Sequence, residues 1–212
     1  MSTYNDIDIT CEQCGEEFQG TVWTAVHAGQ DPELKELLLG GELNLIMCPE
    51  CSYVTYQDHF VLYQDPQAEL VAYIYPLSQK EQAEELRVMM IEGFRHAQLV
   101  YAEKNRIPYD PILLFGLESL IEMMDHEEEL AEQSQIAEYI CKENAIPFVK
   151  LRPSQARQKD LVRVIPSGDS PASTNRESVL AGINRLLKIN PALDVYGRLR
   201  ERIQADPKWP IE

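Results

Sequence analysis

Two pairs of cysteines constrain the fold of this chain of 212 residues more than any other feature of its sequence. Cys11 and Cys14 form one Cys-x-x-Cys turn, and Cys48 and Cys51 form a second. A two-residue spacing lets both thiolates of a turn reach the same ion, and four thiolates are the ligand set of closed, tetrahedral zinc sites. We therefore predict that these cysteines bind one structural Zn²⁺ ion, with no coordination position left open for chemistry.

Two other interpretations of the same cysteines remain open. Sulfur ligation also suits iron, in an iron–sulfur or rubredoxin-like centre. A redox pair is the second alternative, although neither turn directly precedes a helical stretch, as it does in thioredoxin-like units. The fifth cysteine, Cys141, stands in a helical stretch. We expect it to be a small buried hydrophobic residue, as most free cysteines are.

The charge balance limits the partners that the chain can bind. It holds 19 Lys and Arg residues against 35 Asp and Glu residues, and its net charge is −16. Such a field repels phosphate backbones and anionic lipid surfaces, so we expect neither nucleic-acid nor membrane binding. The N-terminus has no basic or apolar run, and no apolar stretch approaches about eighteen residues. Together with cysteines arranged for metal rather than disulfides, this predicts a cytoplasmic protein.

The charge is also unevenly distributed along the chain. Residues 1–76 hold thirteen acids and one base, Lys35, whereas residues 133–212 hold thirteen bases and nine acids. One interpretation is a solvated surface with a mildly basic tail. The other is that the basic segment folds back on the acidic half or pairs with another copy of it. The predicted partner is therefore an unidentified protein or a second copy of this chain.

The pattern of apolar residues predicts an α+β fold. β-branched and aromatic residues cluster at 18–26, 43–47, 53–63 and 70–75, which is typical of short strands. Asp31-Pro32 and Gly40-Gly41 delimit one helix inserted among them. We predict a small four-cysteine zinc-ribbon β-sheet with one inserted helix, followed by a helical domain.

Four segments follow from these patterns. Residues 1–76 are the zinc-ribbon-like β segment. Residues 77–147 are a helical segment, with one helix from Ser78 to Asn105 and another opening at Asp110-Pro111. Residues 148–175 are predicted to be a short strand and a polar linker, because Pro and Gly residues there oppose regular structure. Residues 176–212 are predicted to be a C-terminal helical segment.

Several short motifs in the first segment are shared with a known family: Cys11-Glu12-Gln13-Cys14-Gly15, Val22-Trp23, Asp31-Pro32-Glu33-Leu34, Gly41-Glu42-Leu43-Asn44, Cys48-Pro49-Glu50-Cys51 and Leu62-Tyr63-Gln64-Asp65-Pro66. They resemble the CpXC domain proteins of prokaryotes over about residues 9–130. The resemblance implies that residues 77–147 complete a CpXC-like domain and that the four cysteines are zinc ligands. It implies no activity, because the family is uncharacterised. Glu12 replaces the proline of the first turn and Ser52 the usual glycine after the second, but all four ligands are present.

No HExxH, GxSxG, Walker-type or GxGxxG motif is present, so the sequence lacks the core of common hydrolase and nucleotide sites. We therefore predict a non-enzymatic protein-interaction or structural module. The alternative is an enzyme whose site lies in the helical half, built on carboxylates with His96 or His126. Glu92 precedes His96 by four residues, and Glu122 precedes His126 by the same spacing. A second metal site at these two pairs remains open, as does their interpretation as exposed surface residues.

Overall fold

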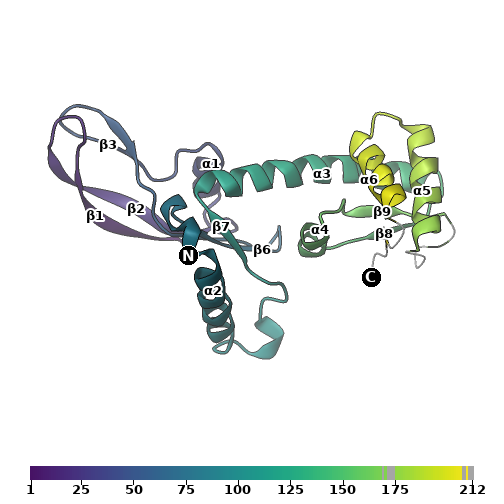
Figure 1. Cartoon of the computed structure of the whole chain (residues 1–212), viewed down its shortest axis with the longest axis horizontal. Helices are drawn as coiled ribbons and strands as arrows, with labels where there is room; N and C mark the ends of the chain where they lie inside the picture. The colour runs from purple at the N-terminus through teal and green to yellow at the C-terminus, as the bar shows by residue number, and fades with distance from the viewer. Residues whose placement is uncertain (169, 171–174, 207–208, 210–212) are drawn as a thin grey trace. The chain divides into compact units, whose positions relative to one another are not determined.

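The computed structural model describes residues 1–168, 170, 175–206 and 209 of the chain. It has a mixed α+β architecture, as predicted from the sequence, and it divides into two compact units (Figure 1). Unit 1 is Met1–Met123 and unit 2 is Met124–Glu212, and the boundary falls inside helix α3 (Leu117–Glu143). Among the described residues, no helix combines the length and the apolar character needed to cross a bilayer.

Unit 1 is built on a five-stranded sheet with strand order β1-β2-β5-β6-β7. Strand β2 connects two parts of this sheet, because it pairs antiparallel with β1 and parallel with β5 through its last three residues. β5 and β6 are antiparallel, and β6 and β7 are parallel. The interior strand β6 is apolar and mostly buried, as expected for a strand covered on both faces. The strands are β1 (Thr3–Thr10), β2 (Glu17–His27), β5 (Val61–Asp65), β6 (Leu70–Tyr75) and β7 (Ile112–Phe115).

The crossover from β2 to β5 carries helix α1 (Pro32–Leu39) and a separate two-stranded sheet of β3 (Leu45–Met47) and β4 (Val54–Tyr56). A parallel pair of strands requires a long crossover, and this one contains the second cysteine turn. Close packing holds the small sheet against β2, because a Cβ on Gly20 would lie 2.8 Å from Ile46 Cδ1. A side chain at this point of β2 would therefore require the side chains of Ile9 and Ile46 to shift.

The helical part of unit 1 differs from the prediction. The helix expected from Ser78 to Asn105 begins with a 3-10 segment, η1 (Leu77–Gln82), continues as α2 (Ala83–Gln98) and is separated from a short 3-10 turn, η2 (Glu103–Asn105). The helix expected to open at Asp110-Pro111 is wrong over residues 112–115, which form strand β7. The open edge of β6 provides a full set of backbone partners there, and this tertiary pairing outweighs the helical spacing of the apolar residues.

Unit 2 combines the C-terminal part of α3 with β8 (Phe148–Lys150), α4 (Pro153–Lys159), β9 (Val164–Pro166), α5 (Arg176–Ile189) and α6 (Asp194–Ala205). β8 and β9 form an antiparallel pair, and α5 and α6 contact each other beside it. The short strand predicted at Phe148 to Leu151 is present as β8, but the polar linker expected to follow it contains α4 and β9. Residues 169 and 171–174 of that expected linker lie outside the described residues.

Candidate metal centre

The two Cys-x-x-Cys turns meet at one end of the β1–β2 hairpin. The four Sγ atoms of Cys11, Cys14, Cys48 and Cys51 all lie within 4.8 Å of one another. The two closest contacts join one turn to the other, at 3.6 Å between Cys11 and Cys51 and at 3.7 Å between Cys14 and Cys48. Four sulfurs at the corners of a tetrahedron, each about 2.3 Å from a central zinc ion, would be about 3.8 Å apart. The cluster therefore has the size of a four-thiolate metal site.

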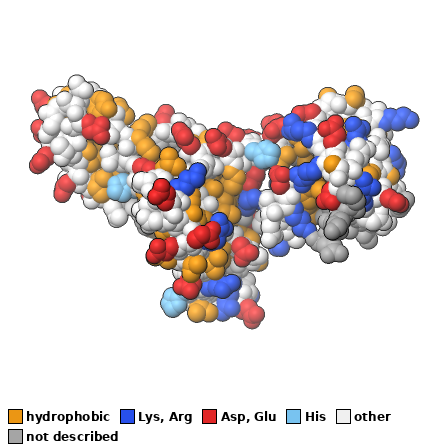
Figure 2. Space-filling view, viewed as in Figure 1, with side chains coloured by type: hydrophobic (Ala, Val, Ile, Leu, Met, Phe, Trp, Pro, Cys, Tyr) orange, Lys and Arg blue, Asp and Glu red, His pale blue; other side chains and the backbone are white. Residues whose placement is uncertain are grey.

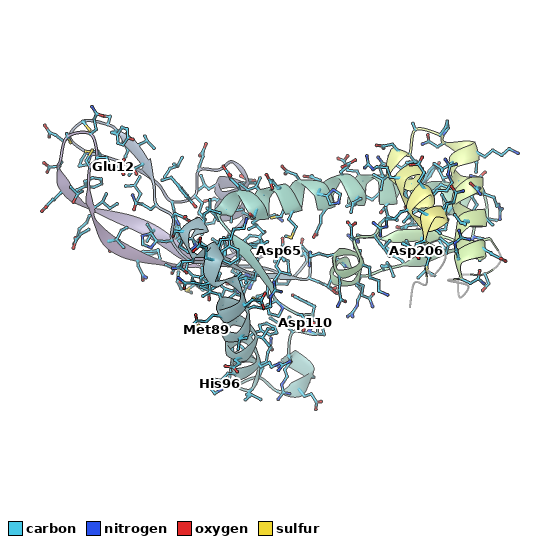
Figure 3. All side chains as sticks on the ribbon, viewed as in Figure 1. Glu12, Asp65, Met89, His96, Asp110 and Asp206 are labelled. Carbon is cyan, nitrogen blue, oxygen red and sulfur yellow. The ribbon has the colours of Figure 1, made fainter. Side chains whose placement is uncertain are left out.

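The first turn joins β1 to β2 and is shaped by backbone hydrogen bonds across it. The N–H of Cys11 donates to the carbonyl of Glu16 at 2.8 Å, and the N–H of Gly15 donates to the carbonyl of Cys11 at 2.9 Å. Gly15 has φ = 76°, in the left-handed region where glycine carries no steric cost. Figure 3 shows Glu12 at this end of unit 1, close to the sulfur atoms. Because Glu12 is exposed, the position tolerates a residue other than proline.

The second turn joins β3 to β4 and repeats the same pattern. The N–H of Cys48 donates to the carbonyl of Tyr53 at 2.8 Å, and the N–H of Ser52 donates to the carbonyl of Cys48 at 2.9 Å. Ser52 has φ = 59° and therefore occupies the left-handed position that Gly15 occupies in the first turn. Each turn offers one buried cysteine, Cys11 or Cys48, and one exposed cysteine. The site is consequently half enclosed by protein.

Asn44 fixes the hairpin that carries the second turn, and the sequence analysis did not identify this role. Its side chain accepts a hydrogen bond from the N–H of Trp23 at 2.7 Å and donates one to the carbonyl of Trp23 at 3.1 Å. The side chain thus pairs with β2 as a neighbouring strand would. Asn44 is buried and has φ = 63°, a conformation that Asn tolerates better than most residues. Its position in the shared Gly41-Glu42-Leu43-Asn44 motif was the only signal available in the sequence.

The thiols cannot all ionise without a cation between them. Desolvation raises the pKa of Cys11, but the N–H groups of Cys14 and Gln13 and the nearby sulfurs outweigh it and lower this pKa to about 7. The N–H of Glu16 lowers the pKa of Cys14, whereas desolvation and the three other sulfurs raise it to about 12. The close sulfurs therefore oppose the ionisation of all four thiols at once. A divalent cation at the centre would remove this conflict by lowering the pKa of every ligand.

The other candidate residues do not assemble into a comparable site. Among the described residues, the four cysteines are the only group of three or more potential ligands that lie close together. Glu92 and His96 are exposed on α2. On α3, Nε2 of His126 lies 3.7 Å from a carboxylate oxygen of Asp160, and both side chains are largely exposed.

Cys141 is not one of the clustered cysteines. It is fully buried in α3, as expected from the sequence, and burial raises its pKa to about 11. A thiol with so high a pKa is almost entirely protonated at neutral pH and is a poor nucleophile. Its chemistry is therefore that of a small core residue.

Comparison with known families gives one match. A family model described as CpXC protein matches residues 9–142, which include all four clustered cysteines and most of α3. No curated protein and no solved structure matches the chain.

Proposed function

The chain belongs to the CpXC family, and we propose that its four cysteines hold one structural zinc ion in a non-enzymatic module that binds another protein. The observation that carries this proposal is the convergence of four sulfurs from two turns into a cluster of tetrahedral size. With four thiolates bound, zinc has no free position for water or substrate. The ion therefore joins β1–β2 to β3–β4 and takes no part in a reaction.

Zinc is favoured over iron by the chemistry of the surroundings as well as by the ligands. A ferric centre is useful as an electron carrier, and its reduction potential depends on a surrounding shell that controls solvent access. Here Cys14 and Cys51 are exposed, so solvent reaches two of the four ligand residues. A structural zinc site needs no more than this, because the ion has no redox chemistry.

The metal content of natively purified protein tests the proposal. We expect one zinc per chain by elemental analysis, with no visible absorption of the kind that ferric thiolates give. Cys48→Ser should abolish stoichiometric binding, because it removes a buried ligand. Cys141→Ala is the matched control, since it removes a cysteine outside the cluster and should leave one zinc bound. Stoichiometric iron, or equal zinc in both variants, would overturn the proposal.

The small sheet that the metal holds offers a surface for a protein partner. Leu45, Met47, Val54 and Tyr56 are all exposed. Leu45 pairs with Tyr56 across the strands and Met47 pairs with Val54, so the four side chains share one face. Ile46 lies between them and turns the other way, onto Gly20 of β2. Exposed apolar side chains gathered in this way are typical of interaction sites.

Charge complementarity indicates the chemistry of the partner. Residues 1–76 hold thirteen acids and one base, so the apolar face lies in an acidic segment. An acidic surface attracts a basic partner and repels acidic proteins and nucleic acids. We therefore propose that the face formed by Leu45, Met47, Val54 and Tyr56 binds a basic protein segment with an apolar anchor.

A peptide array probed with the zinc-loaded protein tests this binding role. Peptides that combine positive charge with a Leu or Phe residue should bind more strongly than acidic peptides or basic peptides without an apolar residue. Met47→Ser should weaken this binding, and added salt should weaken it further by screening. Ile136→Ser removes an exposed apolar side chain from α3 instead and should have no effect. Equal binding of acidic and basic peptides would contradict the proposal.

A further inference from the structure

Helix α2 has a second, unpartnered apolar face that the metal centre does not involve. Its buried residues, Leu86 and Met90, lie on the side that faces the rest of unit 1. Val88 at 55% and Met89 at 56% are instead exposed on α2, as are Leu99 at 66% and Val100 at 80% just beyond its end. Figure 2 shows hydrophobic atoms on the surface in this part of unit 1. These side chains contribute little to the stability of the chain by itself, so their exposure calls for another explanation.

The backbone continues in helical turns from Val88 and Met89 to Leu99 and Val100. α2 ends at Gln98, but the N–H of Leu99 donates to the carbonyl of His96 at 3.0 Å and the N–H of Tyr101 donates to the carbonyl of Gln98 at 3.2 Å. The last turn is therefore tightened rather than unwound. Val88 and Leu99 are eleven positions apart, as are Met89 and Val100, which places each pair on one side of a helix.

Six exposed residues of α2 and of the turn that follows it are arranged symmetrically about residue 94. Val88 and Val100 are equidistant from it, and so are Met89 and Leu99. Between these pairs, Glu92 and His96 are also equidistant from residue 94, are both exposed and are chemically complementary. A two-fold interface brings each residue against the one at the mirror position in a second copy. An antiparallel pair of α2 helices would thus place apolar side chains against apolar ones and carboxylate against imidazole.

A glycine next to the centre of this arrangement allows close approach. Gly93 is exposed, and a Cβ at this position would meet nothing within 4 Å. Glycine inside a helix costs about 1 kcal/mol relative to alanine, and nothing within unit 1 requires it here. At a helix crossing, small residues shorten the distance between the two axes. Gly93 lies beside the position where the two helices would cross.

We propose that α2 is a self-association surface and pairs antiparallel with α2 of a second copy of this chain. The proposal stands on α2 alone and does not depend on the metal or on the apolar face of β3–β4. Two such helices bury less than the roughly 1,200–2,000 Å² of a standard interface, so association should be weak and reversible, in the micromolar range. Because each copy carries a net charge of −16, moderate salt should strengthen association by screening the repulsion between copies. Binding of a basic partner should respond to salt in the opposite direction.

Sedimentation velocity of the full-length, metal-loaded protein over a range of concentrations tests the surface. The wild type should show a concentration-dependent monomer–dimer equilibrium. Met89→Glu should be monomeric throughout, because it places a carboxylate at the centre of the apolar contact. Ile136→Glu introduces the same charge at an exposed apolar position of α3 and should still dimerise. A wild type that stays monomeric, or dimerisation that survives Met89→Glu, would overturn the proposal.

A charge-exchange pair tests the antiparallel arrangement. Figure 3 shows Met89 and His96 on helix α2. Glu92 and His96 are both exposed, so substitutions there should leave the core of unit 1 intact. Glu92→Lys and His96→Glu should each weaken self-association about tenfold, which corresponds to about 1.4 kcal/mol over two equivalent contacts. An equimolar mixture of the two variants should regain dimers, since the introduced ammonium group of one copy then faces the introduced carboxylate of the other. A parallel pairing or a dimer formed elsewhere gives no recovery, and that result would refute the arrangement. Circular dichroism of each variant verifies that α2 is folded.

Discussion

The cysteine-bearing end of unit 1 and the interior of unit 2 are held together in different ways. In unit 2, buried side chains from α3, β9, α5 and α6 form one contiguous apolar cluster, centred on residues such as Ile183, Leu186 and Tyr196. The phenolic hydroxyl of Tyr196 donates to the carbonyl of Val164 at 2.8 Å, so its one polar group is satisfied. At the cysteine end of unit 1, by contrast, β3 and β4 have three residues each and expose most of them.

This difference is the reason to expect that the proposed metal stabilises one region and not the other. A two-stranded sheet with short strands is at best marginally stable, because it buries too little apolar surface. A core of that size contributes no more than about 3–5 kcal/mol, whereas a structural zinc ion contributes on the order of 10–16 kcal/mol in apparent terms. The apolar cluster of unit 2 needs no such support. The two regions should therefore respond separately to metal removal and to loss of core packing.

Metal removal should produce the largest effect and the clearest separation. Chelation, or Cys48→Ser, should remove the apparent contribution of about 10–16 kcal/mol that a structural zinc makes. Amide hydrogen exchange should then rise sharply in both cysteine turns and in β3 and β4, because their backbone hydrogen bonds lose the cross-link that holds them. Exchange in α5 should not change, since its protection comes from the apolar cluster.

Hydrogen exchange with mass spectrometry measures both regions in a single sample. The matched control is Cys141→Ala, which leaves the four clustered thiols intact. Unchanged exchange in β3 and β4 after full metal removal would show that packing alone holds this end together. The contrast between the two regions would then disappear.

A core substitution in unit 2 should give the converse result, with an effect of intermediate size. Leu186 is fully buried in the apolar cluster, and Leu186→Ala leaves a cavity that typically costs about 2–5 kcal/mol. Urea denaturation followed through α5 and α6 should show this loss. The zinc content should stay at that of the wild type, because all four proposed ligands lie in unit 1. Loss of zinc together with the core would show that the two regions are coupled.

The spacing of residues was enough to predict the parts of the fold that local chemistry specifies. The four clustered cysteines were identified from two Cys-x-x-Cys turns alone, and the structure brings their sulfurs together. The inserted helix was bounded by Asp31-Pro32 and by Gly40-Gly41, and α1 spans Pro32–Leu39. Proline suits the first helical position and glycine the end of a helix, so neither prediction required knowledge of tertiary contacts.

The elements that the sequence did not reveal depend on long-range pairing. Residues 112–115 have helical spacing but form β7, because the edge of β6 is available to them. Strand β1 contains Asn5, Asp6 and Asp8, which have low strand propensity. It is nevertheless paired along its whole length with β2, and Asp6 accepts a hydrogen bond from the hydroxyl of Thr21 at 2.8 Å. At an edge strand such charged residues face solvent at little cost.

The sequence did not predict helix α4, because residues at its ends also favour loops. Pro153 opposes regular structure in most contexts but occupies the first turn of α4, where a missing N–H costs nothing. The side chain of Gln155 accepts a hydrogen bond from the N–H of Arg152 at 3.1 Å and so completes the start of the helix. Asp160 ends it in the left-handed conformation. A short helix defined by such caps is difficult to distinguish from a polar loop by composition.

An ion pair in unit 1 gives a smaller and pH-dependent effect away from the metal. Asp65 is only 3% exposed and accepts hydrogen bonds from Lys35 Nζ at 2.8 Å and from the N–H groups of Gln67 and Ala68. Burial raises the pKa of Asp65, but these donors outweigh burial and lower it below its usual value. A carboxyl whose pKa is lowered by folding stabilises the folded state above its unfolded pKa. That stability is lost as the pH falls through the lowered, folded-state value.

Lys35→Met should remove part of this stabilisation. At neutral pH we expect a loss of about 1–3 kcal/mol, because a buried carboxylate loses its charged partner. The difference between variant and wild type should shrink as the pH approaches about 4, where Asp65 of the variant becomes protonated first. Urea denaturation of both proteins at each pH measures this difference. Any metal loss in acid affects both proteins equally, so it does not contribute to the difference between them. A difference that grows on acidification would contradict this assignment.

The smallest effects should come from the two left-handed residues that make the cysteine turns equivalent. Gly15→Ala introduces a Cβ that meets nothing within 4 Å, so its cost is the backbone strain of φ = 76°, about 1–2 kcal/mol. Ser52→Gly relieves the corresponding strain at φ = 59°. Glycine also raises the conformational entropy of the unfolded chain, which lowers the stability of the folded state by about 0.5–1 kcal/mol. The net gain in stability from Ser52→Gly should therefore be below about 1 kcal/mol.

Chelator competition against the zinc-loaded protein should resolve both changes as shifts of opposite sign in apparent zinc affinity. If the turns are equivalent, Gly15→Ala should weaken zinc binding and Ser52→Gly should strengthen it slightly, because each alters only the backbone cost of closing one turn. A weaker affinity for Ser52→Gly would mean that the serine side chain stabilises the second turn by more than its strain costs. The two turns, alike in their hydrogen bonds, would then differ in how they close.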